Sequence, residues 1–576
     1  MEVKLNSKPK KEIDNKTNPI DFLWTQKIPL RDGLSLNATI YKPKQEKPVP
    51  AIFTLTPYIA DSYHSNAVYF TQNGYAFAAI DCRGRGNSEG TFEPNADEGK
   101  DGYDIVEWLT EQSWCDGSVA MWGGSYSGFN QWMTIKEFPP HLKTIIPVAS
   151  SHMAVDFPIY RNIFFPYIIQ WLTWTSGRTL NTNLFKDQKF WREKFRELYL
   201  NHLPFKELDR IVGNTSSYFQ TWLKHPCPDK YWSTRALTSE QYKKLNIPIL
   251  TITGHYDADQ PGAMQYYKMH KKYSSLENFN HYLIIGPWDH AGTRNPEKKF
   301  GGLEFGENSL LDMKKLNKEW YDWILKNGKK PKFLKDKVCY YLMEADEWKF
   351  AINLDSISNQ TKRLYLNSNE EKANSFEQPG VLSEIFPENS QPDKYIYDPL
   401  DVRPAELETE DRDNYLTDQK FIKDLFGNGL IYQTLPFEEN TEITGYVKFS
   451  TWISLNVPDT DFEVTLFEIL PDGSSIFLTQ DFMRARYRES LKQEKLIIPG
   501  EINRYEFAGF TFFSRLIRKN SRLRLLIKSP NSIYIQKNYN SGGVVAEESG
   551  KDARTALITL YHDAEYQSYL DIPVVV

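Results

Sequence analysis

The fold is decided by the stretch Trp122-Gly123-Gly124-Ser125-Tyr126-Ser127-Gly128, which follows the apolar run 118–122 and precedes a helical pattern from Phe129. A serine between small residues on a strand-to-helix turn is typical of a nucleophile elbow, because the strained turn lifts the hydroxyl clear of the backbone. The second glycine lies one place later than the pattern G-x-S-x-G requires. Taken alone, this stretch is therefore better interpreted as a structural glycine-rich turn.

An acid and an imidazole follow two later strand-like runs. The run 248–254 leads into His255-Tyr256-Asp257, and the run 282–285 leads into Gly286-Pro287-Trp288-Asp289-His290. Both side chains would lie at the carboxyl edge of a parallel sheet, which is where ligands bind. The chain order of serine, acid and histidine is that of α/β-hydrolases, so a triad of Ser125, Asp257 and His290 is favoured over the structural turn.

Each residue of this triad has one predicted role. His290 takes the proton of Ser125 as the hydroxyl attacks a carbonyl and then returns it to the leaving group, while Asp257 holds the imidazole and stabilises its cation. Asp259 and Asp289 are alternatives for the acid. Asp289 is adjacent to His290, and adjacent loop residues rarely point at each other, whereas Asp259 lies further along its loop. We therefore predict Asp257 as the acid.

The tetrahedral oxyanion of such a reaction needs two hydrogen-bond donors. The backbone N–H of Tyr126, the residue after the nucleophile, supplies the first by its position. The second is expected from Thr56-Pro57-Tyr58, which follows the apolar run 51–55, and the Tyr58 hydroxyl is the candidate donor. Without this context, a tyrosine after a proline is more often a packing residue.

The hydrophobic pattern divides the chain into three parts. Short apolar runs alternate with helical stretches in residues 1–153 and 247–349, which predicts an α/β-hydrolase catalytic domain with a mostly parallel sheet. Residues 154–246 are aromatic and helical, and we expect a helical cap domain that covers the substrate pocket. Strict alternation, as at Phe462, Val464 and Leu466, predicts an all-β sandwich or jelly-roll domain in residues 350–576.

The composition bounds the classes of partner. The chain has 576 residues, enough for two or three folding units, and a net charge of −6 without blocks of like charge. Nucleic acid is therefore not an expected partner. The segment from Met1 to Lys16 is polar, and no uninterrupted apolar run of about 20 residues occurs, so we expect no secretory signal, no membrane span and a cytoplasmic location.

The cysteines indicate neither disulfides nor a metal site. Cys82, Cys115, Cys227 and Cys339 are far apart, with no C-x-x-C pair and no histidine at zinc-ligand spacing. We expect no cofactor. The expected partner is a small-molecule ester or amide or a short peptide as substrate, and a homo-oligomer is left open.

Several motifs resemble the cocaine-esterase-like hydrolases, which share their fold with X-Pro dipeptidyl-peptidases, α-amino-acid ester hydrolases and glutaryl acylases. The resemblance covers nearly the whole chain, and the displaced glycine of the elbow is itself the variant of this family. The motifs are Arg31-Asp32-Gly33, Pro57-Tyr58, Asp81-Cys82-Arg83-Gly84, Ser88-Glu89-Gly90, Gly123-x-Ser125-Tyr126-x-Gly128, Tyr256-Asp257, Gly286-Pro287-Trp288-x-His290, Pro458-Asp459-Thr460-Asp461-Phe462 and Arg484-Ala485-Arg486-Tyr487-Arg488.

The resemblance implies a serine hydrolase that cleaves an ester or amide bond through an acyl-enzyme. It assigns the triad to Ser125, Asp257 and His290, and the oxyanion hole to the Tyr58 hydroxyl and the N–H of Tyr126. The substrate stays open, because members of the family cleave esters, amides or peptides. An X-Pro dipeptidyl-peptidase-like peptidase and an α-amino-acid ester hydrolase or acyltransferase are the alternatives.

Four further residues are candidates for binding substrate. In amino-acid ester hydrolases an acidic cluster binds the ammonium group of the substrate. Asp259 matches one position of this cluster loosely, Gln260 stands where a second acid is expected, and Asp156 is a candidate for the third. Trp171 and Trp174 of the cap are candidates for an apolar acyl site, with helix packing as the alternative. The alternative from outside the enzyme classes is a catalytically silent protein whose jelly roll binds a carbohydrate or a protein.

Overall fold

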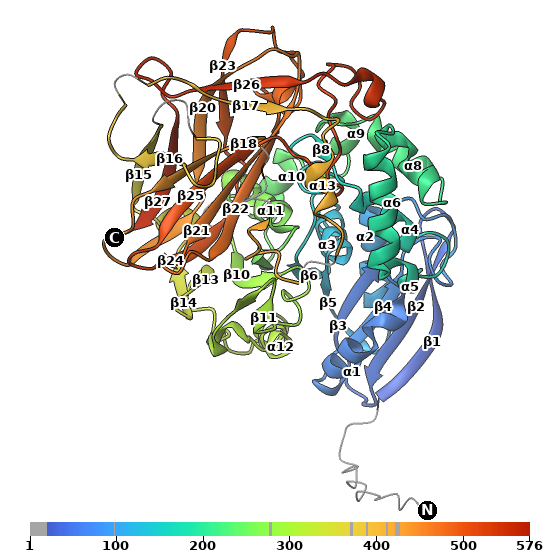
Figure 1. Ribbon diagram of the computed structural model, residues 1–576. Coiled ribbons are helices and arrows are strands. Elements are labelled where there is room, and N and C mark those ends of the chain that lie inside the picture. The colour runs from blue at the N-terminus through green and yellow to red at the C-terminus, as the bar shows by residue number, and fades with distance from the viewer. Residues whose placement is uncertain are drawn as a thin grey trace, which may run out of the picture.

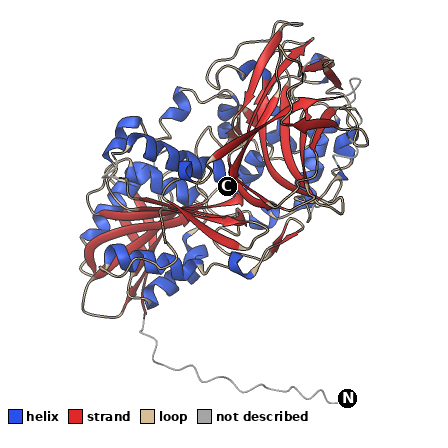
Figure 2. Ribbon diagram, turned by 90° about the vertical axis from the view of Figure 1, so that its left-hand side faces the viewer, coloured by secondary structure: helices blue, strands red, loops and turns tan. Residues whose placement is uncertain are grey.

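Two large β-sheets organise the chain. The structure is a computed structural model that describes residues 20–96, 98–275, 279–368, 373–387, 390–410, 413–420, 425 and 427–576. A mixed sheet with helices on both faces forms the first part, and a separate β-rich part forms the C-terminal region (Figures 1 and 2). The segment from Met1 to Lys16 lies outside the described residues, so the structure does not test its interpretation.

The first sheet has ten strands in the order β1-β2-β4-β3-β5-β6-β9-β10-β13-β14. The strands from β4 to β13 in this order pair in parallel, and the pairings of β1 with β2, β2 with β4 and β13 with β14 are antiparallel. The bounds are β1 Ile20–Pro29, β2 Ser35–Pro43, β3 Val49–Thr56, β4 Ala76–Asp81, β5 Cys115–Gly124, β6 Leu142–Val148, β9 Ile249–Tyr256, β10 His281–Asp289, β13 Val338–Leu342 and β14 Glu347–Ala351.

The central strands are apolar on both faces because helices cover both sides. Helices α2 (Glu98–Thr110), α3 (Tyr126–Ile135) and α11 (Gln260–Tyr273) contribute to one hydrophobic core. Helices α1 (His64–Gln72) and α12 (Met313–Leu325) contribute to the core on the opposite face. The sheet is thereby held rigidly, and residues just past its strand ends are fixed relative to one another.

A helical segment is inserted between β6 and β9. Its longest helix, α6, buries Trp191, Phe195, Leu198 and Tyr199, the four residues whose spacing predicts a helical face. In Figure 1 helices α4, α6 and α8 lie beside the first sheet. The elements of the segment are β7 Ile159–Tyr160, β8 Ile163–Phe164, α4 Tyr167–Trp174, α5 Thr182–Phe185, α6 Gln188–Leu200, α7 Leu208–Ile211, α8 Ser217–Leu223, α9 Lys230–Ser233 and α10 Ser239–Lys244.

The C-terminal part is built on a sheet of thirteen strands. Its described pairings are antiparallel except for that of β16 with β18. The strands are β15 Gln360–Asn367, β16 Gly380–Ser383, β17 Asp393–Tyr397, β18 Gly429–Thr434, β19 Thr441–Gly445, β20 Lys448–Leu455, β21 Asp461–Ile469, β22 Ser475–Arg484, β23 Ile502–Phe507, β24 Phe513–Ile517, β25 Arg522–Lys528, β26 Ala556–Tyr561 and β27 Tyr569–Val575. Shorter elements are β11 Lys299–Phe300, β12 Leu303–Glu304 and α13 Arg403–Glu406.

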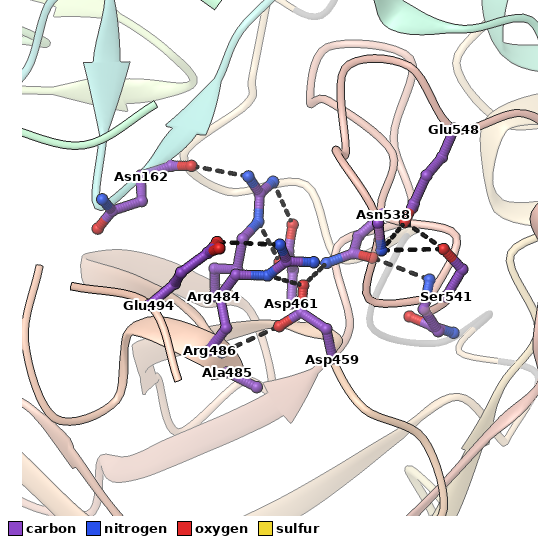
Figure 3. A network of polar contacts seen from close by, with 12 residues as sticks. Asn162, Asp459, Asp461, Arg484, Ala485, Arg486, Glu494, Asn538, Ser541 and Glu548 are labelled. Atoms are coloured by element: carbon purple, nitrogen blue, oxygen red, sulfur yellow. Dashed lines mark hydrogen bonds and ion pairs between the residues drawn. The ribbon is translucent and has the colours of Figure 1, made fainter. Parts of the chain in front are cut away.

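Two motifs of the C-terminal part form a buried ionic network (Figure 3). Arg484 donates two hydrogen bonds to the Asp461 carboxylate, at 2.9 and 3.0 Å, and Arg486 donates to Asp459 at 2.8 Å. Asn538 donates to both carboxylates at 2.9 Å. Arg484 also donates to the carbonyl oxygen of Asn162, at 2.9 Å, so the network fastens the C-terminal sheet to the inserted helical segment.

The four cysteines are free, and Cys82, Cys115 and Cys339 are buried. Among the described residues, no helix combines the length and the apolar character that crossing a bilayer requires.

Candidate active site

The predicted site residues follow four strands and lie at one edge of the first sheet. Tyr58 follows β3, Ser125 follows β5, Asp257 follows β9, and His290 follows β10. These strands are parallel and close together in the order β3-β5-β6-β9-β10, so their carboxyl ends meet at the same edge. The topology therefore brings together residues that are up to 232 positions apart in the sequence.

Ser125 lies on a strained turn between β5 and α3. Its φ of 60° and ψ of −126° are unfavourable for a residue with a side chain. Its N–H donates to the carbonyl oxygens of Val148 and Ala149, at 2.9 and 3.1 Å, which holds the turn in this conformation. A Cβ on Gly128 would lie 3.0 Å from the Ser150 side chain, which explains a small residue there.

The acid and the imidazole are hydrogen-bonded to each other. His290 Nδ1 lies 2.8 Å from Asp257 Oδ1, and the Asp257 side chain is fully buried. Asp257 Oδ2 accepts from the Thr253 hydroxyl at 2.9 Å, and Oδ1 also accepts from the N–H of Asp259 at 3.0 Å. These bonds fix the carboxylate in the plane from which it orients the ring.

The two alternative acids lie differently. Asp259 Oδ2 is 3.8 Å from His290 Nδ1, which is beyond hydrogen-bonding distance. Asp289 Oδ1 accepts from the N–H of Gly292 at 2.7 Å and so turns back onto its own loop. The structure thus pairs His290 with Asp257 and leaves Asp259 as a second carboxylate beside the ring.

The pKa of His290 is set by opposing effects. Burial lowers it, whereas the negative charge of Asp259 and the hydrogen bond to Asp257 raise it, and the net direction is above the ordinary value. The pKa of Asp259 is in turn raised well above its usual range, chiefly by burial. His290 and Asp259 therefore titrate as a pair.

The Ser125 hydroxyl contacts Tyr58 rather than His290. Its Oγ lies 3.4 Å from the Tyr58 hydroxyl, and among the described residues no hydrogen bond joins it to His290. Catalytic hydrogen bonds are often long in the absence of substrate and tighten when it binds. Burial raises the pKa of Tyr58 to about 12, so the phenol keeps its proton at neutral pH.

Tyr126 begins α3, where a backbone N–H has no acceptor within the helix. Its side chain is held by two hydrogen bonds of the hydroxyl group. The hydroxyl donates to the Glu98 carboxyl group, and it accepts from the N–H of Asn95 at 2.7 Å. Burial raises the pKa of Glu98 to about 7. The residue after the nucleophile is therefore held by a buried polar cluster.

The two tryptophans of α4 both contact Tyr58. The Trp171 indole N–H donates to the Tyr58 hydroxyl at 3.2 Å. Trp174 stacks on the Tyr58 ring, with centroids 4.7 Å apart and an interplanar angle of 22°. Both residues thus contact the proposed oxyanion donor directly, a role that their helical spacing did not indicate.

The two candidate acids for substrate binding differ in what they already bind. Asp156 accepts from the N–H groups of His152 and Gly262, at 2.8 and 2.5 Å, and burial raises its pKa to about 8. Asp259 accepts no side-chain hydrogen bond among the described residues. Gln260 uses its amide on backbone groups of Gly254, His255 and Phe512. Only Asp259 therefore presents an uncommitted carboxyl group.

Two arginines at the site were not predicted from the sequence. Arg294 donates to the carbonyl oxygen of His290 at 3.0 Å, and its side chain occupies the space that a Cβ on Gly124 would need. Arg85 is fully buried and donates to backbone carbonyls on both sides, among them Pro57 at 3.0 Å and Thr175 at 2.6 Å. The turn Arg83-Gly84-Arg85-Gly86 marks a special backbone in the sequence, but not the partners of its cations.

Two family models match most of the chain. Residues 32–292 match the X-Pro dipeptidyl-peptidase (S15 family), and residues 334–571 match the X-Pro dipeptidyl-peptidase C-terminal non-catalytic domain. Cocaine esterase of Rhodococcus sp. (strain MB1 Bresler) is 28% identical over 573 residues, which cover 95% of this chain and 97% of the relative.

Two solved structures show a similar fold over the full length. An aminopeptidase from a marine sediment Thaumarchaeota archaeon superposes with a TM-score of 0.83 and 21% identity, covering 100% of this chain and 99% of the other. An α-amino acid ester hydrolase gives 0.82 and 21%, with the same coverage.

The matches and the residues at the sheet edge define the class: the protein is a serine hydrolase that cleaves ester or amide bonds. Within this class, the chain belongs to the cocaine-esterase-like hydrolases of the X-Pro dipeptidyl-peptidase superfamily.

Proposed function

We propose that the chain hydrolyses carboxylic esters through an acyl-enzyme on Ser125. The observation that carries this proposal is the 2.8 Å hydrogen bond between His290 and a fully buried Asp257, at the same sheet edge where Ser125 follows β5. A buried carboxylate on Nδ1 leaves Nε2 as the acceptor for a serine proton. The strained backbone of Ser125 supports the same role.

The mechanism follows from these contacts. Ser125 Oγ attacks the carbonyl carbon as His290 Nε2 accepts its proton, and the imidazolium is stabilised by Asp257. His290 then returns the proton to the leaving alcohol, which departs and leaves an acyl ester on Ser125. Water, deprotonated by the same imidazole, attacks this ester and releases the acid product.

The oxyanion of both tetrahedral intermediates is assigned to two donors. These are the N–H of Tyr126 at the start of α3 and the hydroxyl of Tyr58. The raised pKa of Tyr58, about 12, supports this assignment because a phenol that keeps its proton can donate a hydrogen bond to the oxyanion.

The fold and the domain organisation are part of the proposal. We assign the first sheet and its helices to an α/β-hydrolase catalytic domain, residues 154–246 to a cap, and the C-terminal sheet to a jelly roll. Strand β14 ends at Ala351 within the first sheet, so we place the last boundary after that residue and not after residue 349.

Esters without an α-ammonium group are the proposed substrate class. An acidic cluster for an ammonium group would need several free carboxylates, but Asp156 is committed to backbone N–H groups and Gln260 is neutral. The aromatic surroundings of Tyr58 suit an apolar acyl group. The similar cocaine esterase is named for an ester substrate.

A second candidate is cleavage of amino-acid esters or of peptides with a free amino terminus. It is favoured by the carboxyl group of Asp259, which accepts no hydrogen bond among the described residues and lies 3.8 Å from His290. A substrate ammonium group placed there would pair with this carboxylate. This arrangement would suit the aminopeptidase and ester-hydrolase activities named for the two similar structures.

The test combines labelling with a substrate panel. A fluorophosphonate probe is expected to label the wild-type protein and not the Ser125→Ala variant; a folded wild-type protein that is not labelled would contradict the serine mechanism. Aromatic esters, amino-acid esters and Xaa-Pro anilides then separate the two substrate classes. Faster turnover of the α-amino esters than of matched esters without the amino group would favour the second.

A further inference from the structure

We propose that Trp171 is a positioning residue of the oxyanion hole: its indole N–H binds the Tyr58 oxygen and directs the Tyr58 proton toward the substrate oxyanion. This inference rests on the proposed function, because it takes Ser125 as the nucleophile and Tyr58 as a donor.

The direction of the hydrogen bonds follows from their chemistry. An indole N–H can only donate, so in the 3.2 Å contact between Trp171 Nε1 and Tyr58 Oη the phenol oxygen is the acceptor. The phenol proton must then point elsewhere. Among the described residues, the other hydrogen-bond partner of that oxygen is Ser125 Oγ, at 3.4 Å. The Tyr58 proton therefore points toward the nucleophile, where the carbonyl oxygen of an attacked substrate will lie.

Both partners are held in place by packing. Trp171 is 4% exposed and stacks on the ring of Tyr126, with centroids 5.6 Å apart and an interplanar angle of 14°. Phe157 packs edge-on against the same indole at 5.4 Å. Trp171 thus touches both residues assigned to the oxyanion hole, Tyr126 by its ring face and Tyr58 by its N–H.

Trp174, one turn further along α4, has a different task. It stacks on the Tyr58 ring, but its own N–H donates to the Thr182 hydroxyl at 3.3 Å. The ring of Tyr58 is therefore held by Trp174 and its hydroxyl by Trp171. The two tryptophans form a matched pair in which only one supplies the hydrogen bond.

The loop that carries Tyr58 and the end of α4 are tied together independently. The buried Arg85 donates to the carbonyl oxygen of Pro57, just before Tyr58, and to that of Thr175, just after α4. This cation fixes the distance across which the Trp171 bond forms. An accidental contact between two mobile surfaces would not be held in this way.

The bond also makes Tyr58 a better donor. Burial raises the pKa of Tyr58, whereas the hydrogen bond that it accepts from Trp171 lowers it and so offsets part of the effect of burial. A hydrogen bond into the phenol oxygen polarises the O–H bond, which strengthens its bond to a developing negative charge. The inserted helical segment thereby contributes to the chemical step as well as covering the site.

The test is a double-mutant cycle between Trp171 and Tyr58 on an ester substrate. We expect Trp171→Phe, which keeps an aromatic ring but removes the N–H, to lower kcat about 10-fold with KM changed less than about twofold, as for one neutral hydrogen bond. Tyr58→Phe is expected to lower kcat about 100-fold. The double variant should match Tyr58→Phe alone, because Trp171 acts through that hydroxyl.

Trp191→Phe is the matched control, because the buried Trp191 indole of the same inserted segment donates to the carbonyl oxygen of Leu184 at 2.7 Å and not to Tyr58. It should keep kcat within about threefold of wild type. Wild-type kcat in Trp171→Phe, or a double variant whose loss is the product of the two single losses, would overturn the inference. If Trp171→Phe does not fold, an unnatural residue with a benzothiophene ring at position 171 removes the N–H at constant shape and must give the same kcat loss.

The same experiment separates the two proposals. Wild-type protein that turns over ester but is not labelled by fluorophosphonate, or Ser125→Ala that retains activity, would contradict the proposed function itself. Normal labelling of Ser125 with an additive cycle would contradict only the role of Trp171.

Discussion

Replacement of Asp257 by asparagine separates two carboxylates that lie on the same loop beside the same imidazole. Asp257 accepts the His290 Nδ1 hydrogen bond at 2.8 Å, whereas Asp259 is 3.8 Å from that nitrogen. An asparagine at 257 has nearly the same shape and can still accept from the Thr253 hydroxyl or from the N–H of Asp259. The change therefore removes charge and one acceptor without opening a cavity.

The expected loss can be worked from these contacts. If the amide oxygen faces His290, the ring keeps its tautomer but loses the adjacent negative charge that stabilises the imidazolium. If the amide NH2 group faces His290, it opposes the Nδ1–H and forces the wrong tautomer. The second outcome corresponds to a loss of about 10⁴-fold in kcat, or about 5.4 kcal/mol of transition-state stabilisation. We expect Asp257→Asn to approach this limit.

The assay is steady-state hydrolysis of an aromatic ester together with the rate of fluorophosphonate labelling of Ser125. Both rates should fall in Asp257→Asn, since both depend on the same base. Asp259→Asn, with the same change of charge on the same loop, is the control and should lose less than about 10-fold. Activity of Asp257→Asn within 10-fold of wild type, or an equal collapse in Asp259→Asn, would refute the assignment of the acid.

Three further predictions concern pH and stability. Ionised Asp259 helps to raise the pKa of His290, so Asp259→Asn should shift the acid limb of the kcat/KM profile to lower pH; an unchanged limb would mean that Asp259 is neutral throughout. The folded-state pKa of Glu98, about 7, exceeds its unfolded value, so the wild type loses stability as pH rises through 7. Because Glu98→Gln lacks this ionisation, the Tm of the variant minus the Tm of the wild type should increase between pH 5 and 8. Arg484→Met leaves Asp461 without its bidentate partner in a buried site and should lower the free energy of unfolding by about 3–5 kcal/mol, measured by denaturant titration; a loss below about 1 kcal/mol would contradict this.

The parallel strands and the sheet edge could be predicted from the sequence because their signals are local. The predicted run 142–148 coincides with β6, and the runs at 51–55 and 282–285 lie inside β3 and β10. Short continuous apolar runs bounded by turn residues are typical of strands that are buried on both faces. Once the strands are parallel, residues that follow them must meet at one edge, which is why Ser125, Asp257, His290 and Tyr58 could be placed together.

The edge strands of the same sheet did not stand out in the sequence. Strands β1 and β14 have mixed or half-exposed residues, so their apolar pattern is weak, and they join the sheet through antiparallel pairing with a neighbour. Their place in the sheet depends on that neighbour and not on their own composition. The boundary predicted at residue 349 fell inside β14 for this reason.

Hydrogen-bond partners within the site were beyond prediction for a related reason. Trp171 and Trp174 have the same residue type and lie three residues apart on α4, yet one indole donates to Tyr58 and the other to Thr182. Helical spacing states which residues share a face, but the direction of an N–H within that face depends on the rotamer that packing selects. The acceptor of each indole N–H therefore depends on the packed structure and not on the sequence spacing.

Two buried acidic residues near the triad differ in the hydrogen bonds that their carboxyl groups accept. Asp259 lies beside His290, and the charge of Asp156 acts on Asp259; both acids have raised pKa values, chiefly because they are buried. Asp156 accepts two backbone N–H bonds, so its role is to hold the loop at His152 against the start of α11. Among the described residues, the Asp259 carboxyl group accepts no hydrogen bond; His290 lies 3.8 Å from it, and the charge of Arg294 also acts on it. Of these two carboxyl groups, only that of Asp259 can therefore gain a strong partner from the substrate, and a preference for or against ammonium groups should depend on this one side chain.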